Sequence, residues 1–268
     1  MCLKHGIKSL DTIDDDGRYT KHIKKFEGIH IFKADQIVIE KLKECKKLLA
    51  NGKLTHSYPH SWRSKAPLVH RATSQWFISM EKKDLRKKAL KAIDDTDFYP
   101  ERGRDRIRSM IETRPDWCIS RQRIWGVPLP LFVSKKTKEP LKDPEVIENI
   151  AKIFEKEGAD CWFTDDPQKF LGTKYKKDDY IKSNDIVEVW FDSGATHSYV
   201  LEKRKDLTWP ASMYLEGSDQ HRGWFHSSLL ESCGTRGRAP FENILSHGFV
   251  AVSYTHLRAH ETDSYLVC

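Results

Sequence analysis

A glycine-containing acidic turn is the part of this sequence best suited to bind a ligand. A strand predicted over Ser212–Leu215 is followed by Glu216-Gly217-Ser218-Asp219, and a helix is expected over about Gln220–Ser232. In an open parallel sheet, ligands bind beyond the carboxyl ends of the strands. Carboxylates there suit ribose hydroxyls, an amino group or an amide, and a glycine lets the backbone approach closely. Taken alone, the segment is equally compatible with an ordinary strand–helix turn capped by Asp219.

Two further predicted strands end in similar turns. Ile186–Phe191 is followed by Asp192-Ser193-Gly194, and Ile244–Ser246 is followed by His247-Gly248-Phe249. The histidine could donate a hydrogen bond and the phenylalanine offers a flat face for an adenine, but three residues form a weak pattern. Trp190 could wall a pocket, although a lone tryptophan is more often a core residue because large aromatics dominate core burial.

Arginine and tryptophan are concentrated between residues 114 and 128. Arg114, Arg121 and Arg123 are interspersed with Trp117 and Trp125. These residue types hold RNA phosphates and stack on bases. A basic interdomain linker anchored by the two tryptophans explains the same composition equally well.

Histidine and cysteine give no metal-binding pattern. His56, His60 and His70 could suggest a metal hydrolase, but Pro59 prevents the helical i, i+4 geometry that such a site would use. None of the cysteines forms a C-x-x-C pair, so neither a zinc knuckle nor a disulfide framework is expected. We therefore predict no metal site and reduced, mostly buried thiols.

The composition is that of a globular chain of one large domain or two ordinary ones. Of the 268 residues, 38% are hydrophobic and 32% are charged, and the net charge is +7. No apolar run approaches the ~18 residues needed to cross a membrane, and Met1–Leu10 lacks the apolar core of a signal peptide. A cytoplasmic location is therefore expected, with no membrane partner. The positive net charge is only slight evidence for a polyanionic partner such as RNA.

The elements that would position these residues are clearest after residue 80. Asp143 is expected to cap a helix with Pro144 at its first position and Gly158 at its end. Shorter helices are predicted over Asp84–Asp94 and Arg104–Glu112. The last third alternates strand and helix, which indicates an α/β fold.

The first quarter of the chain gives weaker signals. We predict a strand over Phe26–Phe32. Asp35 is expected to cap a helix that runs through Leu49 and ends at Asn51-Gly52.

The last residues resemble a laboratory sequence rather than natural coding sequence. From Val252 the chain reads Val-Ser-Tyr-Thr-His-Leu-Arg-Ala-His-Glu-Thr, which is similar to the translation of a transposon adapter used to prepare DNA libraries. We therefore expect residues 252–268 to be a sequencing artefact. His256, His260 and Glu261 imitate a metal site at helical spacing, and we give them no weight.

Four long motifs occur in an order and spacing typical of one enzyme family. They are Arg-Pro-Asp-Trp-Cys-Ile-Ser-Arg-Gln-Arg-Ile-Trp-Gly-Val-Pro (114–128), Val-Trp-Phe-Asp-Ser-Gly (189–194), Met-Tyr-Leu-Glu-Gly-Ser-Asp-Gln-His-Arg-Gly-Trp-Phe (213–225) and Ser-His-Gly-Phe (246–249). On the basis of these motifs, the chain resembles the bacterial form of the isoleucyl-tRNA synthetases over about residues 4–249. The valyl and leucyl enzymes share Ile-Ser-Arg-Gln-x-x-Trp-Gly, but residues 191–194 and 216–220 favour the isoleucyl branch.

The resemblance implies an α/β fold made of two partial domains. These are the second half of a class I Rossmann-like catalytic domain and the C-terminal part of a β-rich editing domain. Residues 1–113 would belong to the editing domain and residues 114–133 would return to the catalytic domain. Residues 134–184 would form a small connective insertion, and residues 185–251 the second half of the Rossmann-like sheet.

The implied activity is that of an aminoacyl-tRNA ligase. Isoleucine reacts with ATP, which carries Mg²⁺, to give isoleucyl-adenylate, and the aminoacyl group is then transferred to tRNA(Ile). Because an apolar pocket discriminates poorly against one missing methylene, with isoleucine against valine the standard example, the family also hydrolyses mischarged valine. The resemblance implies isoleucine, ATP and tRNA(Ile) as partners and a monomeric full-length enzyme.

The resemblance also assigns binding residues. The aminoacyl-adenylate would be held by Glu216, Gly217, Asp219 and Gln220. The adenine side would be lined by His247, Gly248 and Phe249, and the isoleucine pocket by Trp190 and Trp224. The tRNA would be contacted by Arg114, Trp117, Arg121 and Arg123.

Two family motifs do not occur in the sequence, namely His-Ile-Gly-His and Lys-Met-Ser-Lys-Ser, which bind ATP phosphates. We therefore assign no catalytic residue and expect the isolated chain to be inactive, because phosphate-stabilising charge supplies much of the catalysis. The alternatives are a non-catalytic RNA-binding chain that uses Arg114 to Arg123, and a relative of the valyl- or leucyl-tRNA synthetases.

Overall fold

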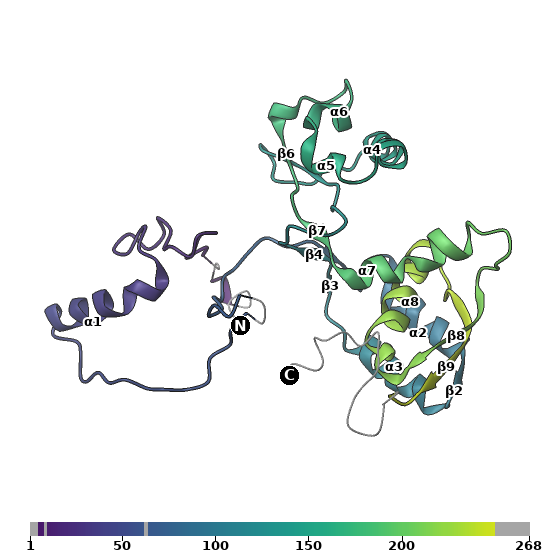
Figure 1. Cartoon of the computed structure of the whole chain (residues 1–268), viewed down its shortest axis with the longest axis horizontal. Helices are drawn as coiled ribbons and strands as arrows, with labels where there is room; N and C mark the ends of the chain where they lie inside the picture. The colour runs from purple at the N-terminus through teal and green to yellow at the C-terminus, as the bar shows by residue number, and fades with distance from the viewer. Residues whose placement is uncertain (1–4, 8–9, 62–63, 250–268) are drawn as a thin grey trace. The chain divides into compact units, whose positions relative to one another are not determined.

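The computed structural model describes residues 5–7, 10–61 and 64–249, which form two compact units, 1–74 and 75–268 (Figure 1). The expected adapter-derived segment, residues 252–268, lies outside the described residues. The unit that contains the sheet therefore begins at Gln75, whereas the sequence led us to expect the change of domain at residue 114.

The first unit consists mostly of turns and has one longer helix, α1 (Ala34–Glu44), preceded by the 3₁₀ turn η2 (Ile31–Lys33). The predicted strand over Phe26–Phe32 is wrong, because its only pairing is an isolated bridge between His30 and Arg18. The predicted helix cap at Asp35 is wrong, since α1 starts one residue before it. The predicted helix end is wrong too, because α1 stops at Glu44, well before Leu49. Among the described residues of this unit, pairing is limited to isolated bridges, so the strands expected of a β-rich domain are not seen there.

A parallel three-stranded sheet is the centre of the second unit (Figure 1). Its order is β2 (Asp97–Tyr99), β9 (Phe241–His247) and β8 (Ala211–Gly217), with β9 in the middle. The strands predicted over Ser212–Leu215 and Ile244–Ser246 are thus confirmed and slightly longer than expected. β2 was not predicted, because three residues are too few to show alternation.

Three helices pack beside this sheet: α2 (Leu85–Asp94), α3 (Arg102–Glu112) and α8 (Trp224–Thr235). The predicted helices at 84–94 and 104–112 are confirmed within two residues. The apolar spacing of Ile107 and Ile111 in α3 buries both side chains. α8 contributes Phe225 and Leu229, and β9 contributes Ile244, to the same main core.

Short antiparallel strands connect the sheet to the rest of the unit. β1 (Phe77–Ile78) pairs with β3 (Trp117–Cys118), and β4 (Ser120–Arg121) pairs with β7 (Ile186–Val187). The predicted strand over Ile186–Phe191 is therefore wrong in its second half, since the helix α7 (Val189–Gly194) starts directly after Glu188. The short π-helix η5 (His197–Leu201) follows α7.

Residues 132–182 build a second, smaller core. It comprises β5 (Phe132–Ser134), α4 (Pro144–Glu157), α5 (Cys161–Thr164), α6 (Pro167–Leu171), the 3₁₀ turn η4 (Lys177–Asp179) and β6 (Tyr180–Lys182). Trp162 is fully buried at its centre, and Val146 and Ile150 of α4 pack with it. The predicted start of α4 is confirmed, because the Asp143 carboxylate accepts a hydrogen bond from the Glu145 backbone N–H at 2.9 Å.

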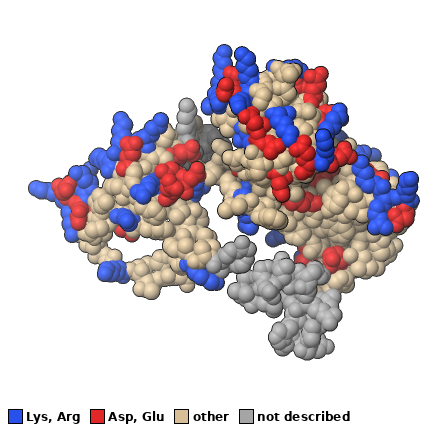
Figure 2. Space-filling view, turned by 45° about the horizontal axis from the view of Figure 1, so that its top comes forward, with Lys and Arg blue, Asp and Glu red and all other residues tan. Residues whose placement is uncertain are grey.

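The part of the chain that the structure describes contains no helix long and apolar enough to cross a membrane. Figure 2 shows that Lys and Arg side chains are interspersed with Asp and Glu on the face drawn there, rather than gathered in one basic patch. The net charge of +7 therefore does not by itself locate a polyanion site on this face.

Candidate functional site

The carboxyl ends of β8 and β9 bring two of the predicted groups of site residues together. The parallel register pairs Glu216 with Ser246 and Gly217 with His247. The Oε1 atom of Glu216 lies 4.0 Å from Nε2 of His247, and both side chains are about one-third exposed. Glu216 Oε1 also accepts a hydrogen bond from the Gly217 backbone N–H at 3.0 Å. A carboxylate and an imidazole thus share one edge of the sheet and are accessible from solvent.

The turn after β8 holds the remaining polar residues of the predicted group. It is the 3₁₀ helix η6 (Ser218–His221), in which the Gln220 side-chain amide donates to Asp219 Oδ2 at 3.1 Å. Gln220 Oε1 accepts from the Trp224 backbone N–H at 2.9 Å, which connects this turn to the start of α8. A β-carbon added to Gly217 would lie 2.6 Å from Asp219 Oδ1. A larger residue at 217 would therefore require the exposed Asp219 carboxylate to move away from the strand end.

Trp190 reaches this turn from a different element than expected. It lies on α7 rather than on a strand of the sheet, so the three turns do not follow three neighbouring strands. A β-carbon added to Gly223 would nevertheless lie 2.8 Å from Trp190 Cη2 and 2.5 Å from Gln220 Oε1. The indole is 38% exposed. It can therefore form an apolar wall next to the Gln220 amide.

Trp224 supports this region from within the core. Its ring stacks on Tyr214 with centroids 4.0 Å apart and an interplanar angle of 5°. Its Nε1–H donates to the Ser193 carbonyl at 3.0 Å, which joins α8 to α7. One face of the Trp224 ring is thus covered by Tyr214, whereas Trp190 is exposed.

A cavity of about 240 Å³ opens at the same edge of the sheet. Its walls include His247 and Gly248, together with two cationic residues from the start of α3, Arg102 and Arg106. Phe249, the last of the predicted adenine-side residues, is 64% exposed. Neither arginine was predicted as a site residue, because β2, which directly precedes α3, could not be detected in the sequence.

Most of the predicted RNA contacts form an internal network instead. Trp117 is 5% exposed and donates from Nε1 to Glu188 Oε1 at 2.9 Å. Arg114 lies over the Trp117 ring at 5.4 Å, and burial lowers the pKa of its guanidinium. Arg121 pairs with Glu188 Oε2 at 3.2 Å. The linker interpretation thus fits Arg114 and Trp117, because a buried indole cannot stack on a base.

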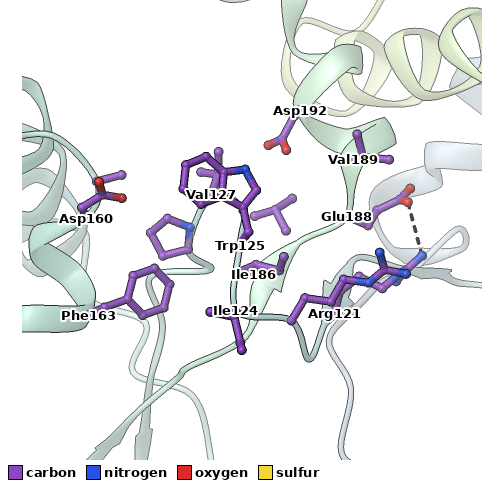
Figure 3. Close-up of a pocket in the computed structure, with 15 residues that line it drawn as sticks. Arg121, Ile124, Trp125, Val127, Asp160, Phe163, Ile186, Glu188, Val189 and Asp192 are labelled. Carbon is purple, nitrogen blue, oxygen red and sulfur yellow. Dashed lines mark hydrogen bonds and ion pairs between the residues drawn. The ribbon is translucent and has the colours of Figure 1, made fainter. Parts of the chain in front are cut away.

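The exposed part of this segment lines a cavity of about 630 Å³ (Figure 3). Trp125 is 88% exposed, and Arg123 forms no hydrogen bond or ion pair with the described residues. Figure 3 shows the Trp125 ring between Phe163 and Asp160 on one side and the Arg121–Glu188 ion pair on the other. The residues predicted to contact tRNA include Arg123 but not Trp125, although base stacking by the two tryptophans was one of the two interpretations of this segment.

The histidines at 56 and 60 are engaged with neighbouring backbone. His56 Nδ1 lies 2.8 Å from the Ser57 carbonyl, and His60 Nδ1 lies 2.7 Å from the Tyr58 carbonyl. Across residues 5–7, 10–61 and 64–249, no group of three or more His, Cys, Asp or Glu side chains is arranged to hold a metal ion.

Comparison with known proteins places the chain among aminoacyl-tRNA synthetases. Residues 13–254 match the family described as tRNA synthetases class I (I, L, M and V). The chain is 76% identical over 250 residues to an isoleucine–tRNA ligase of Pelagibacter ubique, and this covers 93% of the chain and 28% of that protein. Isoleucine–tRNA ligases of Caulobacter vibrioides and Zymomonas mobilis are 52% and 51% identical, over 92% and 93% of the chain.

The chain spans 27–28% of the length of these three relatives. The family match, in contrast, extends over most of the chain and includes the strand ends, the turn after β8 and the Arg–Trp segment. The chain therefore belongs to the class I tRNA synthetases.

Proposed function

We propose that the chain is part of an isoleucine–tRNA ligase. The whole protein would join isoleucine to ATP, which carries Mg²⁺, to give isoleucyl-adenylate and pyrophosphate, and would then load tRNA(Ile) and hydrolyse mischarged valine. The names of the most similar relatives support this activity. Within it, the described residues bind and orient the adenylate rather than supply the phosphate-stabilising charge.

The pairing of Gly217 with His247 carries the proposal. It brings the acidic turn and the His247-Gly248-Phe249 segment to one edge, where a parallel sheet binds nucleotides. The Glu216 and Asp219 carboxylates can accept hydrogen bonds from ribose hydroxyls and from the ammonium group of the aminoacyl part. The amide of Gln220 offers both a donor and an acceptor, while Gly248 and Phe249 can line the adenine.

Trp190 and Trp224 would bind the isoleucine side chain. The exposed part of the Trp190 ring supplies the apolar wall, because it lies against Gly223 and close to Gln220. Trp224 acts mainly by holding α7 and α8 together through its bond to the Ser193 carbonyl. Burial of an aliphatic side chain against an indole contributes about 25 cal/mol per Å² of apolar surface, from which the entropy cost of binding is subtracted.

A single-stranded part of tRNA would bind along the cavity that contains Trp125 and Arg123. An exposed indole can stack on a base, and an unpaired guanidinium can neutralise a phosphate. Arg121 would contribute less charge, since Glu188 already pairs with it. The carboxylates of Asp160, Glu188 and Asp192 in the same walls favour a neutral base over a second phosphate there.

We base the proposed domain boundaries on the strands that pair in the parallel sheet. Residues 1–74 would belong to the editing domain, and residues 75–133 and 185–251 to the Rossmann-like catalytic domain. We place the change near residue 75 rather than at 114 because β2 pairs with β9. Residues 134–184 would be the connective insertion, since they contribute most of the second core.

Calorimetric titration of the 268-residue chain with a non-hydrolysable isoleucyl sulfamoyl-adenosine tests this function. We expect saturable binding that is weaker for the valyl and leucyl analogues. Tight, salt-dependent binding of tRNA without any affinity for the isoleucyl analogue would support the non-catalytic RNA-binding alternative instead. Tighter binding of the valyl or leucyl analogue would instead assign the chain to the valyl- or leucyl-tRNA synthetases.

A further inference from the structure

The cavity of about 240 Å³ at the carboxyl end of β9 has two arginines in its walls to which the proposed function gives no role. Arg102 and Arg106 are exposed, and across the described part of the chain neither forms a hydrogen bond or an ion pair. The other two arginines of α3 are engaged, since Arg104 donates to a backbone carbonyl and Arg108 pairs with Glu112. The guanidinium groups of the first two are therefore free to bind a ligand.

The helix α3 carries both arginines on the face that borders the turn after β8. Residues four apart on a helix share one face, and Gly103 lies between them and against His221 of that turn. A β-carbon added to Gly103 would lie 2.9 Å from His221 Nε2. His221 Nδ1 in turn lies 2.7 Å from the Ser218 carbonyl. The close approach at Gly103 thus places the part of the helix that carries Arg102 and Arg106 beside η6.

The walls of this cavity favour an anion. Besides the two arginines they include Ser218 and Ser246, and none of the described residues that line it is an Asp or Glu. Three carboxylates, in contrast, line the cavity around Trp125. Burial lowers the pKa of the His221 ring, and the positive charge of Arg106 lowers it further, so this charge acts at the cavity wall that His221 forms. A negatively charged group would therefore be attracted and would meet no like charge in the walls.

The size of the cavity and its donors suit a phosphate group. Drug-sized ligands occupy roughly 300–1,000 Å³, so a cavity of about 240 Å³ accommodates a smaller group. Arginine binds phosphate oxygens through paired, charge-assisted hydrogen bonds, and serine hydroxyls can donate as well. His247 and Gly248 of the proposed adenine side line the same cavity. A phosphate group bound there would thus lie next to the proposed adenylate site.

We propose that this cavity binds a phosphate group through Arg102 and Arg106, with the hydroxyl groups of Ser218 and Ser246 as further donors. The group belongs either to the inorganic pyrophosphate released when the adenylate forms or to the last phosphodiester of the tRNA strand that receives isoleucine. This choice of sources rests on the proposed function, whereas the phosphate chemistry rests on the cavity. Both arginines are binding residues, and neither replaces the phosphate-stabilising charge of the reaction.

Titration of the 268-residue chain with inorganic pyrophosphate at constant ionic strength, followed by NMR, tests the proposal. The side-chain Nε–Hε signals of Arg102 and Arg106 should shift, whereas that of Arg204, an exposed arginine paired with Asp206, should not. Arg106→Gln should weaken the binding of pyrophosphate about tenfold, because charge-assisted hydrogen bonds are lost. Arg204→Gln removes the same charge outside the cavity, so it is the matched control and should leave the affinity unchanged.

A short single-stranded RNA that ends in CCA distinguishes the two sources of the phosphate group. It is compared with the same strand that carries a neutral methylphosphonate at its last linkage. If the phosphodiester is the source, the neutral linkage should weaken binding about tenfold in the unsubstituted chain and have no effect in Arg106→Gln. If pyrophosphate is the source, the two strands should bind with equal affinity.

Arginine signals that respond to neither pyrophosphate nor RNA would overturn the proposal, as would equal losses of affinity in Arg106→Gln and Arg204→Gln. Isoleucyl sulfamoyl-adenosine carries no phosphate group, so its binding to the same chain is an independent measurement. Binding of that analogue without binding of phosphate would refute this site and leave the proposed function intact. Binding of phosphate without binding of the analogue would contradict the proposed function alone.

Discussion

Gly217 and His247 are the last residues of two neighbouring parallel strands, and the register pairs them with each other. Because all strands of a parallel sheet end on one side, this pairing determines which edge of the sheet can bind a ligand. The Glu216 carboxylate and the His247 ring, with 4.0 Å between Oε1 and Nε2, lie at that edge. The proposed adenylate site is the region around this pair.

Gly217→Ala should impair ligand binding more than folding. The backbone of Gly217, at φ −63° and ψ 155°, is allowed for alanine, but the new β-carbon would lie 2.6 Å from Asp219 Oδ1 and displace that carboxylate. We expect the free energy of unfolding to change by less than ~1 kcal/mol. The affinity for isoleucyl sulfamoyl-adenosine should fall about tenfold, or ~1.4 kcal/mol, in calorimetric titration.

Gly234→Ala is the matched control for this substitution. The new β-carbon would make an ordinary contact with Leu85 Cδ1 at 3.6 Å. Alanine also has a higher helix propensity than glycine at this position, the next-to-last residue of α8. Stability should increase by up to ~1 kcal/mol, with the affinity unchanged. Equal losses of affinity in both variants would show that Gly217 has no special role in binding.

Trp125→Ala should weaken RNA binding without destabilising the chain. The Trp125 side chain is 88% exposed, so its removal should change the free energy of unfolding by less than ~0.5 kcal/mol. Loss of a stacked base should cost about 1–3 kcal/mol of affinity for tRNA in a filter-binding or fluorescence assay. Arg123→Ala should reduce the salt dependence of that affinity by about one phosphate contact.

Trp117→Ala provides the contrast, because its indole is buried and bonded to Glu188. That variant should lose about 3–5 kcal/mol of stability. If Trp125→Ala bound tRNA as well as the unsubstituted chain, the cavity in Figure 3 would not be the RNA site.

Glu231 should make the stability of the second unit depend on pH. Its pKa of about 9 in the folded chain is above its ordinary value of 4.5. Between these two values the folded state binds more protons than the unfolded state, so stability falls as the pH rises. Glu231→Gln should match the unsubstituted chain near pH 4 and exceed its stability at pH 8.5 by on the order of 1–3 kcal/mol.

Amide hydrogen exchange of α8 at the two pH values measures this difference. Glu242→Gln should show the same pH dependence as the unsubstituted chain, since that carboxylate is exposed. Lower stability of Glu231→Gln at pH 8.5 would mean that the folded state uses the ionised carboxylate, contrary to this account.

Trp162→Ala should unfold the small core alone. Trp162 is fully buried among Phe132, Phe170 and Val146, and its Nε1–H donates to the Ser183 carbonyl at 2.8 Å. We expect a loss of about 3–5 kcal/mol that is confined to residues 132–182. Hydrogen exchange should then increase in α4 and α6 but not in β8 and β9. A simultaneous loss of protection in β9 would show that the two cores fold as one.

Long periodic helices and strand ends with polar turns were predictable from the sequence. The cap at Asp143, the apolar spacing of α3 and the strand before Glu216 each depend on local signals, so the structure reproduces them. β2 was missed because three residues carry no periodicity, and its place beside β9 depends on a pairing across more than half of the chain.

Burial was the other property that the sequence could not provide. Trp117 and Trp125 occur in the same motif, yet only Trp117 enters the core, where Glu188 from a distant segment binds its indole N–H. Trp190 lies in an apolar segment that predicted a strand, but the helix α7 begins one residue before it. Packing against Gly223, which the sequence does not reveal, places its ring beside the turn after β8. The strand register brings Glu216 and Gly217 next to His247, and Trp190 lies close to Gln220, but the elements that carry these residues were only partly foreseen.

A structure of the chain with bound isoleucyl sulfamoyl-adenosine, by crystallography or from intermolecular NOEs, would test the central claim most directly. We predict one molecule whose adenine contacts His247 and Gly248, whose ribose is bonded by Glu216 or Asp219, and whose aliphatic side chain contacts Trp190. A ligand that binds elsewhere and leaves Gly217 and His247 without contact would contradict the account.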